Sequence, residues 1–402
     1  MITQSLSYSK KPLIGSSKVY ALFLALLPLI MAYRVPGIGM GFSTILIAVG
    51  LIPASFLLLA KHDRINYFLI FLLLLYLGYV ITKVEGNNFL LPIAIIIHIA
   101  AISTGVIKTD FLRTCLEKIS ILASFCVLLQ QIAHLFLGVH IPMMFSSLLL
   151  EDLAEHYSSA LNTGYGIENI YRPSAFFLEP SHFSQYCIYG LGSFLFRPFP
   201  SYRSAMIVSL GFFSTTSGMG FVLVFGIWSF WALFYRNNKM NVSLIPKLFF
   251  LIFVLLILFF ILMQIPFFEQ TVNRFTGGGN SDYNAIDGRL FFWTSQFGDK
   301  TITDLIYGFG EEEIEEGVYL TGFMKILFAY GIIGLVLFLI FILYLLFCTR
   351  SYVRFYVAIY LALLFLANLI GFIAFIFNIG VILSLHLQYL YLKNDKLFHI
   401  QR

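Results

Sequence analysis

The sequence predicts an all-α, polytopic integral membrane protein with about twelve transmembrane helices and two larger extracytoplasmic loops. Hydrophobic residues make up 59% of the 402 residues and charged residues only 11%, whereas a soluble domain carries roughly a quarter charged residues. The mean hydropathy is +0.89. The apolar residues also form long runs instead of a stripe with helical period, and a span needs ~20 such residues because the bilayer core is about 30 Å thick.

The expected spans are the apolar runs between clusters of charged residues. In chain order they lie near 19–33, 40–60, 65–82, 89–107, 119–137, 174–196, 204–217, 218–235, 247–264, 326–348, 354–370 and 372–392. The run near 204–217 is short, and the run near 174–196 is interrupted by polar residues. We expect residues 1–402 to form a single membrane domain.

The connections between these spans differ in charge. With the N-terminus inside, most of the 25 Lys and Arg residues fall in cytoplasmic segments and most of the 20 Asp and Glu residues fall outside. Because an excess of Lys and Arg in cytoplasmic loops sets the orientation of a membrane protein, both termini are predicted to be cytoplasmic. Two connections on the outer side are long, at 138–171 and 265–325. Loops of this length are usually functional or disordered, so candidate functional residues are expected there.

The first loop ends in an unusual stretch, in which residues 171–186 read YRPSAFFLEPSHFSQY. Arg172 and Glu179 each precede a proline, which disfavours the helical conformation and predicts a broken span. Pro180 suits the first position of a helix, with Ser181 and His182 in its first turn. The positive end of such a half-helix, with the Arg172 guanidinium beside it, is suited to binding phosphate.

Glu179 allows two interpretations. A carboxylate at membrane depth costs ~2.5–3.5 kcal/mol, so it is usually paired or functional. It can form a structural ion pair with Arg172, it can act directly in catalysis, or it can do both. His182 is a candidate base, although a single histidine at a helix start is more often a hydrogen-bonding residue.

The second loop carries Arg274 and, on one face of an expected helix, Arg289 and Trp293. A guanidinium with an aromatic ring suits a sugar phosphate, and the alternative is a helix lying in the membrane interface. The acidic run at 311–316 fits a solvated loop better than a metal site, because its spacing matches no calcium-binding loop. The small polar residues at 214–218 favour a tight turn over contact with a lipid-linked substrate. We expect no bound metal and no cofactor.

Five features taken together resemble the O-antigen polymerase (Wzy) family of bacterial polysaccharide polymerases, which is related to the O-antigen ligases. They are R-P-x-x-x-F-x-E-P-S at 172–181, the Ser/Thr-rich turn at 214–218, G-R-x-x-x-W at 288–293, G-F-G at 308–310, and the segment 319–334 that returns to the membrane. The ligase branch usually carries a His-Asn pair before this last helix. Residues 316–319 read EGVY here, which favours a polymerase over a ligase and removes an obvious base.

The resemblance implies a membrane glycosyltransferase in the bacterial inner (plasma) membrane that acts in polysaccharide or lipopolysaccharide biosynthesis. A growing glycan would pass from undecaprenyl (polyprenyl) diphosphate to a lipid-linked repeat unit on the outer face. Its partners would be the polyprenyl-diphosphate-linked oligosaccharide, membrane lipids and a polysaccharide chain-length regulator, with no nucleic acid. A flippase or other transporter is the rival class, but it predicts charged residues deep within several spans.

The expected site residues follow from the motifs. The catalytic candidates are Arg172, Glu179 and Arg289. The substrate-binding candidates are Tyr171, Ser181, His182, Arg274, Trp293 and Tyr319. Two arginines and a helix N-terminus would neutralise the leaving diphosphate, and Glu179 would orient or deprotonate the acceptor hydroxyl.

Overall fold

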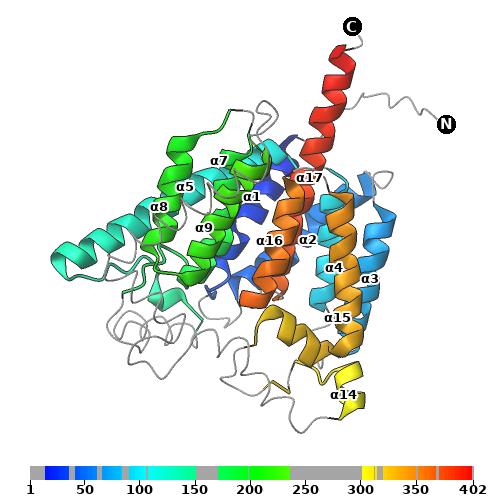
Figure 1. The fold of residues 1–402 in the computed structure, drawn as a ribbon. Helices are drawn as coiled ribbons and strands as arrows, with labels where there is room; N and C mark the ends of the chain where they lie inside the picture. The colour runs from blue at the N-terminus through cyan, green and yellow to red at the C-terminus, as the bar shows by residue number, and fades with distance from the viewer. Residues whose placement is uncertain are drawn as a thin grey trace.

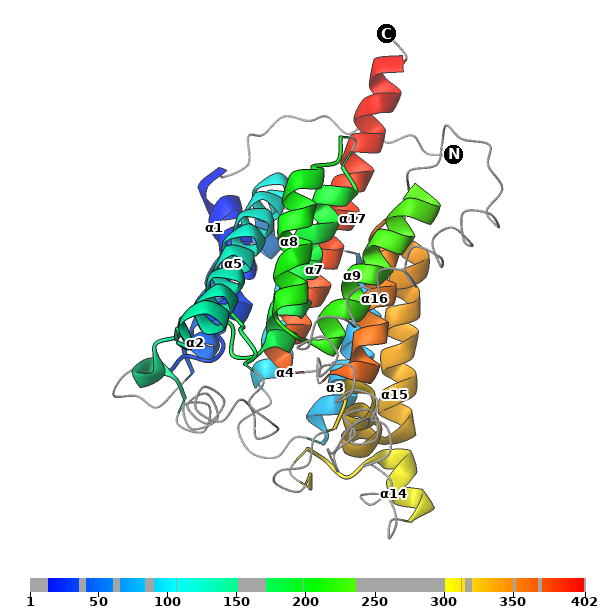
Figure 2. The same cartoon turned by 60° about the vertical axis from the view of Figure 1, so that its left-hand side comes forward.

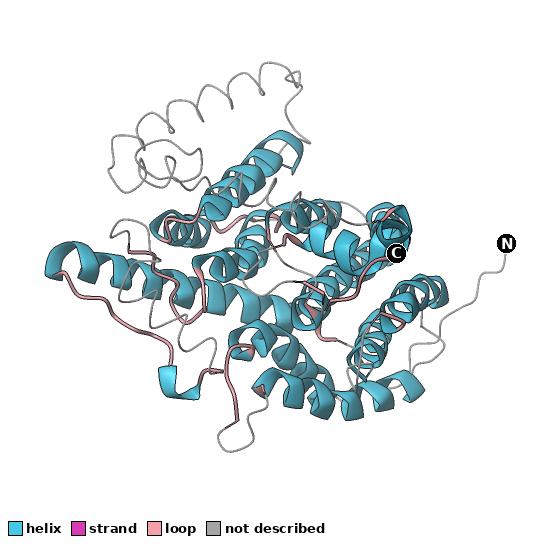
Figure 3. Cartoon of the chain, turned by 90° about the horizontal axis from the view of Figure 1, so that it is seen from below, coloured by secondary structure: helices cyan, strands magenta, loops and turns pink. Residues whose placement is uncertain are grey.

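The computed structural model describes residues 14–35, 41–60, 66–83, 90–105, 107–150, 171–197, 199–235, 301–311, 313–314, 320–349, 352–367 and 371–400. Within these ranges the ordered elements are helices, which pack side by side as a bundle (Figure 1). The only strand-like pairings there are two isolated bridges, Tyr33 with Leu149 and Arg34 with Gly41. The predicted all-α class is therefore confirmed for the described residues, as the helices and loops of Figure 3 show.

The first half of the chain supplies five long helices and one short turn of helix. They are α1 (Ile14–Ile30), α2 (Phe42–Ala60), α3 (Tyr67–Ile81), α4 (Leu90–Ser103), α5 (Thr109–Leu137) and the 3-10 turn η3 (Ser146–Leu148). Each long helix matches a predicted span. Helix α5 begins ten residues before the predicted 119 because Asp110, Arg113 and Glu117 form ion pairs at its start, so that charge does not end the helix.

The second half follows the same pattern. Its elements are α7 (Pro180–Leu195), α8 (Tyr202–Ser214), α9 (Gly218–Phe230) with the π-helical turn η4 (Trp231–Tyr235), α14 (Ile302–Tyr307), α15 (Gly322–Cys348), α16 (Val353–Leu366) and α17 (Phe372–Ile400). The predicted tight turn at 214–218 is confirmed, and Ser217 caps α9 by accepting a hydrogen bond from the Gly220 amide (3.4 Å). The predicted span 247–264 lies outside the described residues.

Some of these helices could span a membrane. By length and composition, three in the described part of the chain are long and apolar enough, namely α2, α5 and α15. Shorter apolar helices lie at Ser17–Ile30, Tyr67–Ile81, Leu90–Ser103, Gly218–Leu233, Val353–Phe365 and Ile373–Leu387. A membrane protein is indicated, and the number of twelve spans stays a prediction.

The bundle has two distinct ends. Helix α1 starts and α17 finishes at one end, while α14 lies at the other (Figure 2). We call the second end the loop face, because α1 ends and α7 begins there, next to the two large predicted loops. The sequence predicts that the loop face is extracytoplasmic.

Helix α7 lies inside the bundle and contacts α5, α8 and α9. Its buried positions run almost without interruption from Phe183 to Leu195. A helix that is buried on all sides is packed within protein instead of facing lipid. The span that the sequence marks as least typical is thus a central helix.

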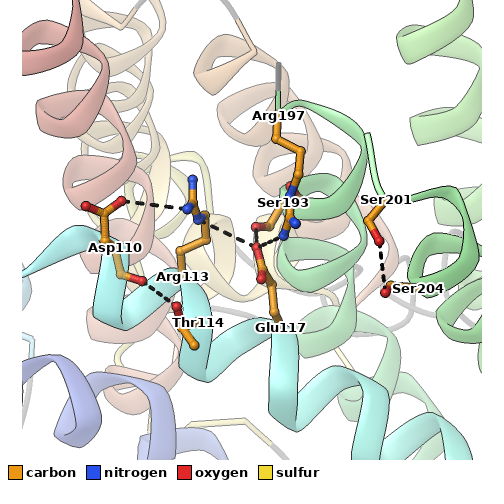
Figure 4. Close-up of polar contacts among 8 residues, drawn as sticks. All are labelled: Asp110, Arg113, Thr114, Glu117, Ser193, Arg197, Ser201 and Ser204. Carbon is orange, nitrogen blue, oxygen red and sulfur yellow. Dashed lines mark hydrogen bonds and ion pairs between the residues drawn. The ribbon is translucent and has the colours of Figure 1, made fainter. Parts of the chain in front are cut away.

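A polar cluster joins α5 to the far end of α7 (Figure 4). The Glu117 carboxylate accepts hydrogen bonds from Ser193 and from the Arg197 guanidinium, and Arg113 Nε lies 3.6 Å from the same oxygen. The Glu117 side chain is only 14% exposed, whereas that of Asp110 is 68% exposed and pairs with Arg113 at 3.7 Å. Glu117 is therefore the centre of this cluster.

Replacing Glu117 with alanine should destabilise the protein by about 2 kcal/mol, because it leaves two arginines without their shared, partly buried counter-charge. Thermal and denaturant unfolding in detergent would measure this loss. The matched control is Asp110→Ala on the same helix, for which we expect a change within about 0.5 kcal/mol because the pair is exposed. Equal effects of the two substitutions would contradict the central role of Glu117.

Candidate functional site

The chain leaves helical geometry over residues 171–179 and then starts α7. Pro180 is the first helical residue, and Glu179 precedes it in an extended conformation (φ −138°, ψ 155°). This confirms the predicted break and its cause, since a residue before proline is pushed out of the helical region. Arg172 and Glu179 therefore lie on an irregular segment at the loop face, just before the N-terminus of α7.

A turn holds this segment in place. Ser174 donates its hydroxyl to the Phe177 carbonyl (2.7 Å), and the Phe177 amide donates to the Ser174 carbonyl (3.0 Å). Between them Ala175 adopts a positive φ of 54°, which is uncommon for a residue with a side chain. Its amide donates to Gln130 Oε1 of α5 (2.8 Å), and Gln130 Nε2 donates to the Ile141 carbonyl (2.8 Å). A strained backbone persists where its surroundings determine it fully, and such positions gather at functional sites.

The Glu179 carboxylate lies at the start of α7. Ser181 donates its hydroxyl to Glu179 Oε2 (2.8 Å), and the Phe183 amide donates to the Glu179 carbonyl (3.2 Å). Both side chains are partly exposed. The N-terminus of a helix favours negative charge beside it. The predicted Arg172–Glu179 ion pair stays a prediction.

Three aromatic rings pack at the beginning of the segment. The Tyr171 ring stacks on His140 with centroids 4.5 Å apart and an angle of 2°, and it lies 4.7 Å from His134. The two histidines also contact each other, with His140 Nε2 3.1 Å from His134 Nδ1. Tyr171 is buried and Arg172 half-buried. This stack holds the two ends of the first predicted loop together, and it thereby fixes the position of the backbone next to Arg172.

A cavity of about 260 Å³ lies beside the first turn of α7, between α1, α2, α4, α7 and α17. His182, Gln185 and Tyr186 form its wall on α7, and Ala374, Phe377 and Asn378 form part of its wall on α17. The structure thus brings one predicted substrate-binding residue, His182, to a cavity. Arg274, Arg289, Trp293 and Tyr319 lie outside the described residues.

The G-F-G motif at 308–310 packs against a break in α15. Gly331 leaves helical geometry at φ 64° and ψ −170°, which divides α15 into two segments. The Phe309 amide donates to the Phe328 carbonyl (3.0 Å) and the Gly310 amide to the Ala329 carbonyl (2.9 Å). The motif therefore satisfies carbonyl groups beside the break, as backbone at membrane depth requires.

The acidic run that follows begins with a residue that is not a solvated charge. Glu311 is paired with Lys325 (Nζ to Oε2, 3.0 Å) and accepts a hydrogen bond from the Tyr330 hydroxyl. The interpretation as a solvated loop is wrong for Glu311, because its carboxylate contacts two residues of the folded helix α15. Glu313 is exposed, and Glu312, Glu315 and Glu316 lie outside the described residues.

Replacing Gly331 with alanine should destabilise the fold by about 3 kcal/mol or more, through backbone strain and overpacking. A Cβ at Gly331 would lie 2.4 Å from the Ile306 carbonyl oxygen, and one at Gly308 would lie 2.4 Å from the Gly331 amide nitrogen. The unfolding temperature in detergent would measure the loss. Gly78→Ala is the control, since its Cβ would meet no described atom within 4 Å apart from its own helix backbone, and it should leave stability unchanged or slightly higher.

The structure also adds residues that the sequence reading missed. Gln130, His134 and His140 hold the 171–179 segment from α5 and from the residues just after it. Their one signal in the sequence is polarity at the end of an apolar run. No protein-family model matches the chain, and comparisons with curated proteins and with solved structures give no match.

Proposed function

We propose that this protein is a membrane polysaccharide polymerase. It transfers a growing glycan from polyprenyl diphosphate to the non-reducing sugar of a lipid-linked repeat unit, on the extracytoplasmic face of the bacterial inner membrane. In this proposal the loop face is extracytoplasmic and both termini are cytoplasmic. The resemblance of five motifs to the O-antigen polymerases suggested the reaction, and the break before α7 is the observation that carries it.

The break supports the proposal because Arg172 and Glu179 lie on one irregular segment that leads into the N-terminus of α7. Arg172 and the N-terminus of α7 are suited to neutralising a diphosphate. Glu179 is a carboxylate directly before the partly buried first turn that carries Ser181 and His182. A non-catalytic scaffold gives no reason for an Arg and a Glu on an irregular segment at one face, and a transporter would be expected to carry charged residues deep within several spans. Arg289 of the second loop is proposed as a second cation on the diphosphate.

The reaction is a displacement at the anomeric carbon. The acceptor hydroxyl oxygen attacks this carbon and forms the new glycosidic bond, while the bond from the carbon to the diphosphate oxygen breaks. The hydroxyl proton passes to the Glu179 carboxylate, and polyprenyl diphosphate leaves with the bonding electrons, held by Arg172 and Arg289. A single displacement of this kind inverts the anomeric centre.

Purified protein in lipid vesicles, given a lipid-diphosphate-linked repeat unit, should produce a ladder of products that differ by one repeat. Gel electrophoresis with a labelled sugar would show it. A single addition to a different lipid acceptor would indicate a ligase instead. Movement of the lipid-linked sugar across the vesicle membrane without any product would indicate a transporter. Either result would overturn the proposal.

A further inference from the structure

We propose that the cavity between α1, α2, α4, α7 and α17 binds the hydrocarbon of the lipid substrate next to its diphosphate, which is about the first two isoprene units of the carrier. This inference rests on the proposed function, and it places the apolar part of the substrate beside the first turn of α7. It also predicts which part of the lipid the protein recognises by shape.

The position of the cavity connects it to the proposed reaction site. His182, which lines it, follows Glu179 by three residues, so the two lie on neighbouring positions of one helix turn. The other walls come from the end of α1, the first two turns of α2 and α17, and the first turn of α4. A lipid whose diphosphate lies at the start of α7 can therefore enter the cavity with its first carbons.

The walls offer a ligand little to hydrogen-bond. Among the residues that the structure describes, no Asp, Glu, Lys or Arg lines the cavity. Two of its polar side chains, Asn378 and Tyr186, already form hydrogen bonds within the protein. Asn378 accepts a hydrogen bond from the Tyr189 hydroxyl (2.6 Å) and donates one to the Ala374 carbonyl (2.7 Å). The Tyr186 hydroxyl donates to the Ala25 carbonyl (2.9 Å). A sugar would exchange its many hydrogen bonds to water for the few that Thr44, His182 and Gln185 can offer here, whereas a hydrocarbon has none to lose.

The volume of the cavity also favours a short hydrocarbon. A cavity of 150 Å³ holds benzene, so about 260 Å³ accommodates roughly ten carbon atoms, which is two isoprene units. An oligosaccharide repeat is too large for it. The rings of Tyr186 and Phe377, which both line the cavity, stack on each other with centroids 5.3 Å apart and an angle of 10°, so this part of the wall is aromatic and apolar.

A phospholipid presents the same chemistry of phosphate and hydrocarbon, so the experiment must separate the two sources. We would incubate the full-length protein in detergent with geranyl diphosphate that carries a diazirine on its terminal carbon, irradiate it and map the adducts by mass spectrometry. Adducts are expected on the peptides that contain Met31 and Ala374. Unlabelled geranyl diphosphate should reduce them at least about tenfold, and phosphatidylglycerol at the same concentration should not.

A filled cavity is the second measurement. Ala374→Phe should reduce the adducts at least about tenfold, whereas Ala362→Phe, the same change at an exposed position of α16, should leave them unchanged. Adducts that are spread over the lipid-facing surface, or that phosphatidylglycerol displaces equally well, would overturn the inference. Since mapping uses the unaltered protein, the result stands even if Ala374→Phe fails to fold.

The inference and the proposed function can fail separately. If the vesicle assay yields a polymer ladder but no adduct maps to the cavity, the cavity assignment is wrong and the polymerase assignment stands. If adducts map to the cavity and no polymer forms, the protein binds prenyl diphosphates for another purpose. Competition by free monosaccharide instead of geranyl diphosphate would overturn the lipid assignment and indicate a sugar site.

Discussion

Replacing Arg172 with alanine should abolish chain elongation while the protein still inserts and folds. Loss of a single preorganised group that stabilises transition-state charge costs about 10²–10³-fold in rate, and Arg172 is the one guanidinium on the irregular segment before α7. Arg172→Lys should recover only part of the activity, because the ammonium lacks the planar fork that binds two phosphate oxygens. The length distribution of polymer from a lipid-linked repeat unit would measure both variants.

The matched control for this change is Arg354→Ala. Arg354 donates to the Thr349 carbonyl (2.8 Å) near the start of α16, at the end of the bundle away from the loop face. Its loss should leave elongation per folded molecule within about twofold, as expected of a surface interaction. Full-length polymer from Arg172→Ala would remove this residue from the reaction. If an Arg289→Ala variant also made full-length polymer, the assignment of diphosphate binding to these two arginines would be wrong.

The start of α7 could be predicted because its cause is local. A proline fixes its own φ and restricts the residue before it, so the pairs at 172–173 and 179–180 determine where the helix cannot form. Charge clusters bound several other apolar runs in the same local way, although α5 and α17 both run on through charged residues. For this reason the ends of most described helices lie within a few residues of the predicted spans, as for α2, α3 and α16.

The break in α15 could not be predicted, because it depends on a distant partner. The run 326–348 is almost wholly apolar, and glycine is common in membrane helices. Gly331 leaves helical geometry in a place where residues 306–310 lie close enough to donate hydrogen bonds to the exposed carbonyls. The G-F-G motif and the helix that follows it are therefore one structural unit, which neither segment reveals alone.

The contacts around the candidate site could not be predicted either, because they too depend on residues distant in the chain. The contact between Gln130 and Ala175 joins residues 45 positions apart, and the stack of Tyr171 on His134 and His140 joins residues across the whole first predicted loop. A single sequence shows which side chains are polar, but it does not show which of them meet. Arg172 and Glu179 could be predicted because each directly precedes a proline. The residues that contact their segment have no such local signal and could not be predicted.

Replacing Glu179 with glutamine should slow glycosyl transfer by about 10²–10⁴-fold, which is the usual contribution of a positioned acid or base. The amide has nearly the same shape and can still accept the hydrogen bond from Ser181, which is 2.8 Å long in the structure. It cannot take the proton of the acceptor hydroxyl. The acid side of the pH–rate profile, which protonation of this carboxylate would set, should also flatten. Initial rates of repeat addition between about pH 3 and pH 8, a range that includes the ordinary titration of a glutamate carboxyl near pH ~4.3, would measure both effects.

Two further variants separate a chemical role from a structural one. Glu313→Gln makes the same change at an exposed carboxylate after the G-F-G motif, and it should leave the rate and the pH profile unchanged. Ser181→Ala removes the hydroxyl that orients Glu179 but keeps the charge, so we expect a several-fold lower rate with the acid limb retained. If Glu179→Gln instead lowered stability and kept the wild-type rate per folded molecule, the carboxylate would be a structural partner at the start of α7. The base would then have to be sought among other groups at the loop face, with His182 the first candidate because it lies in the same helix turn.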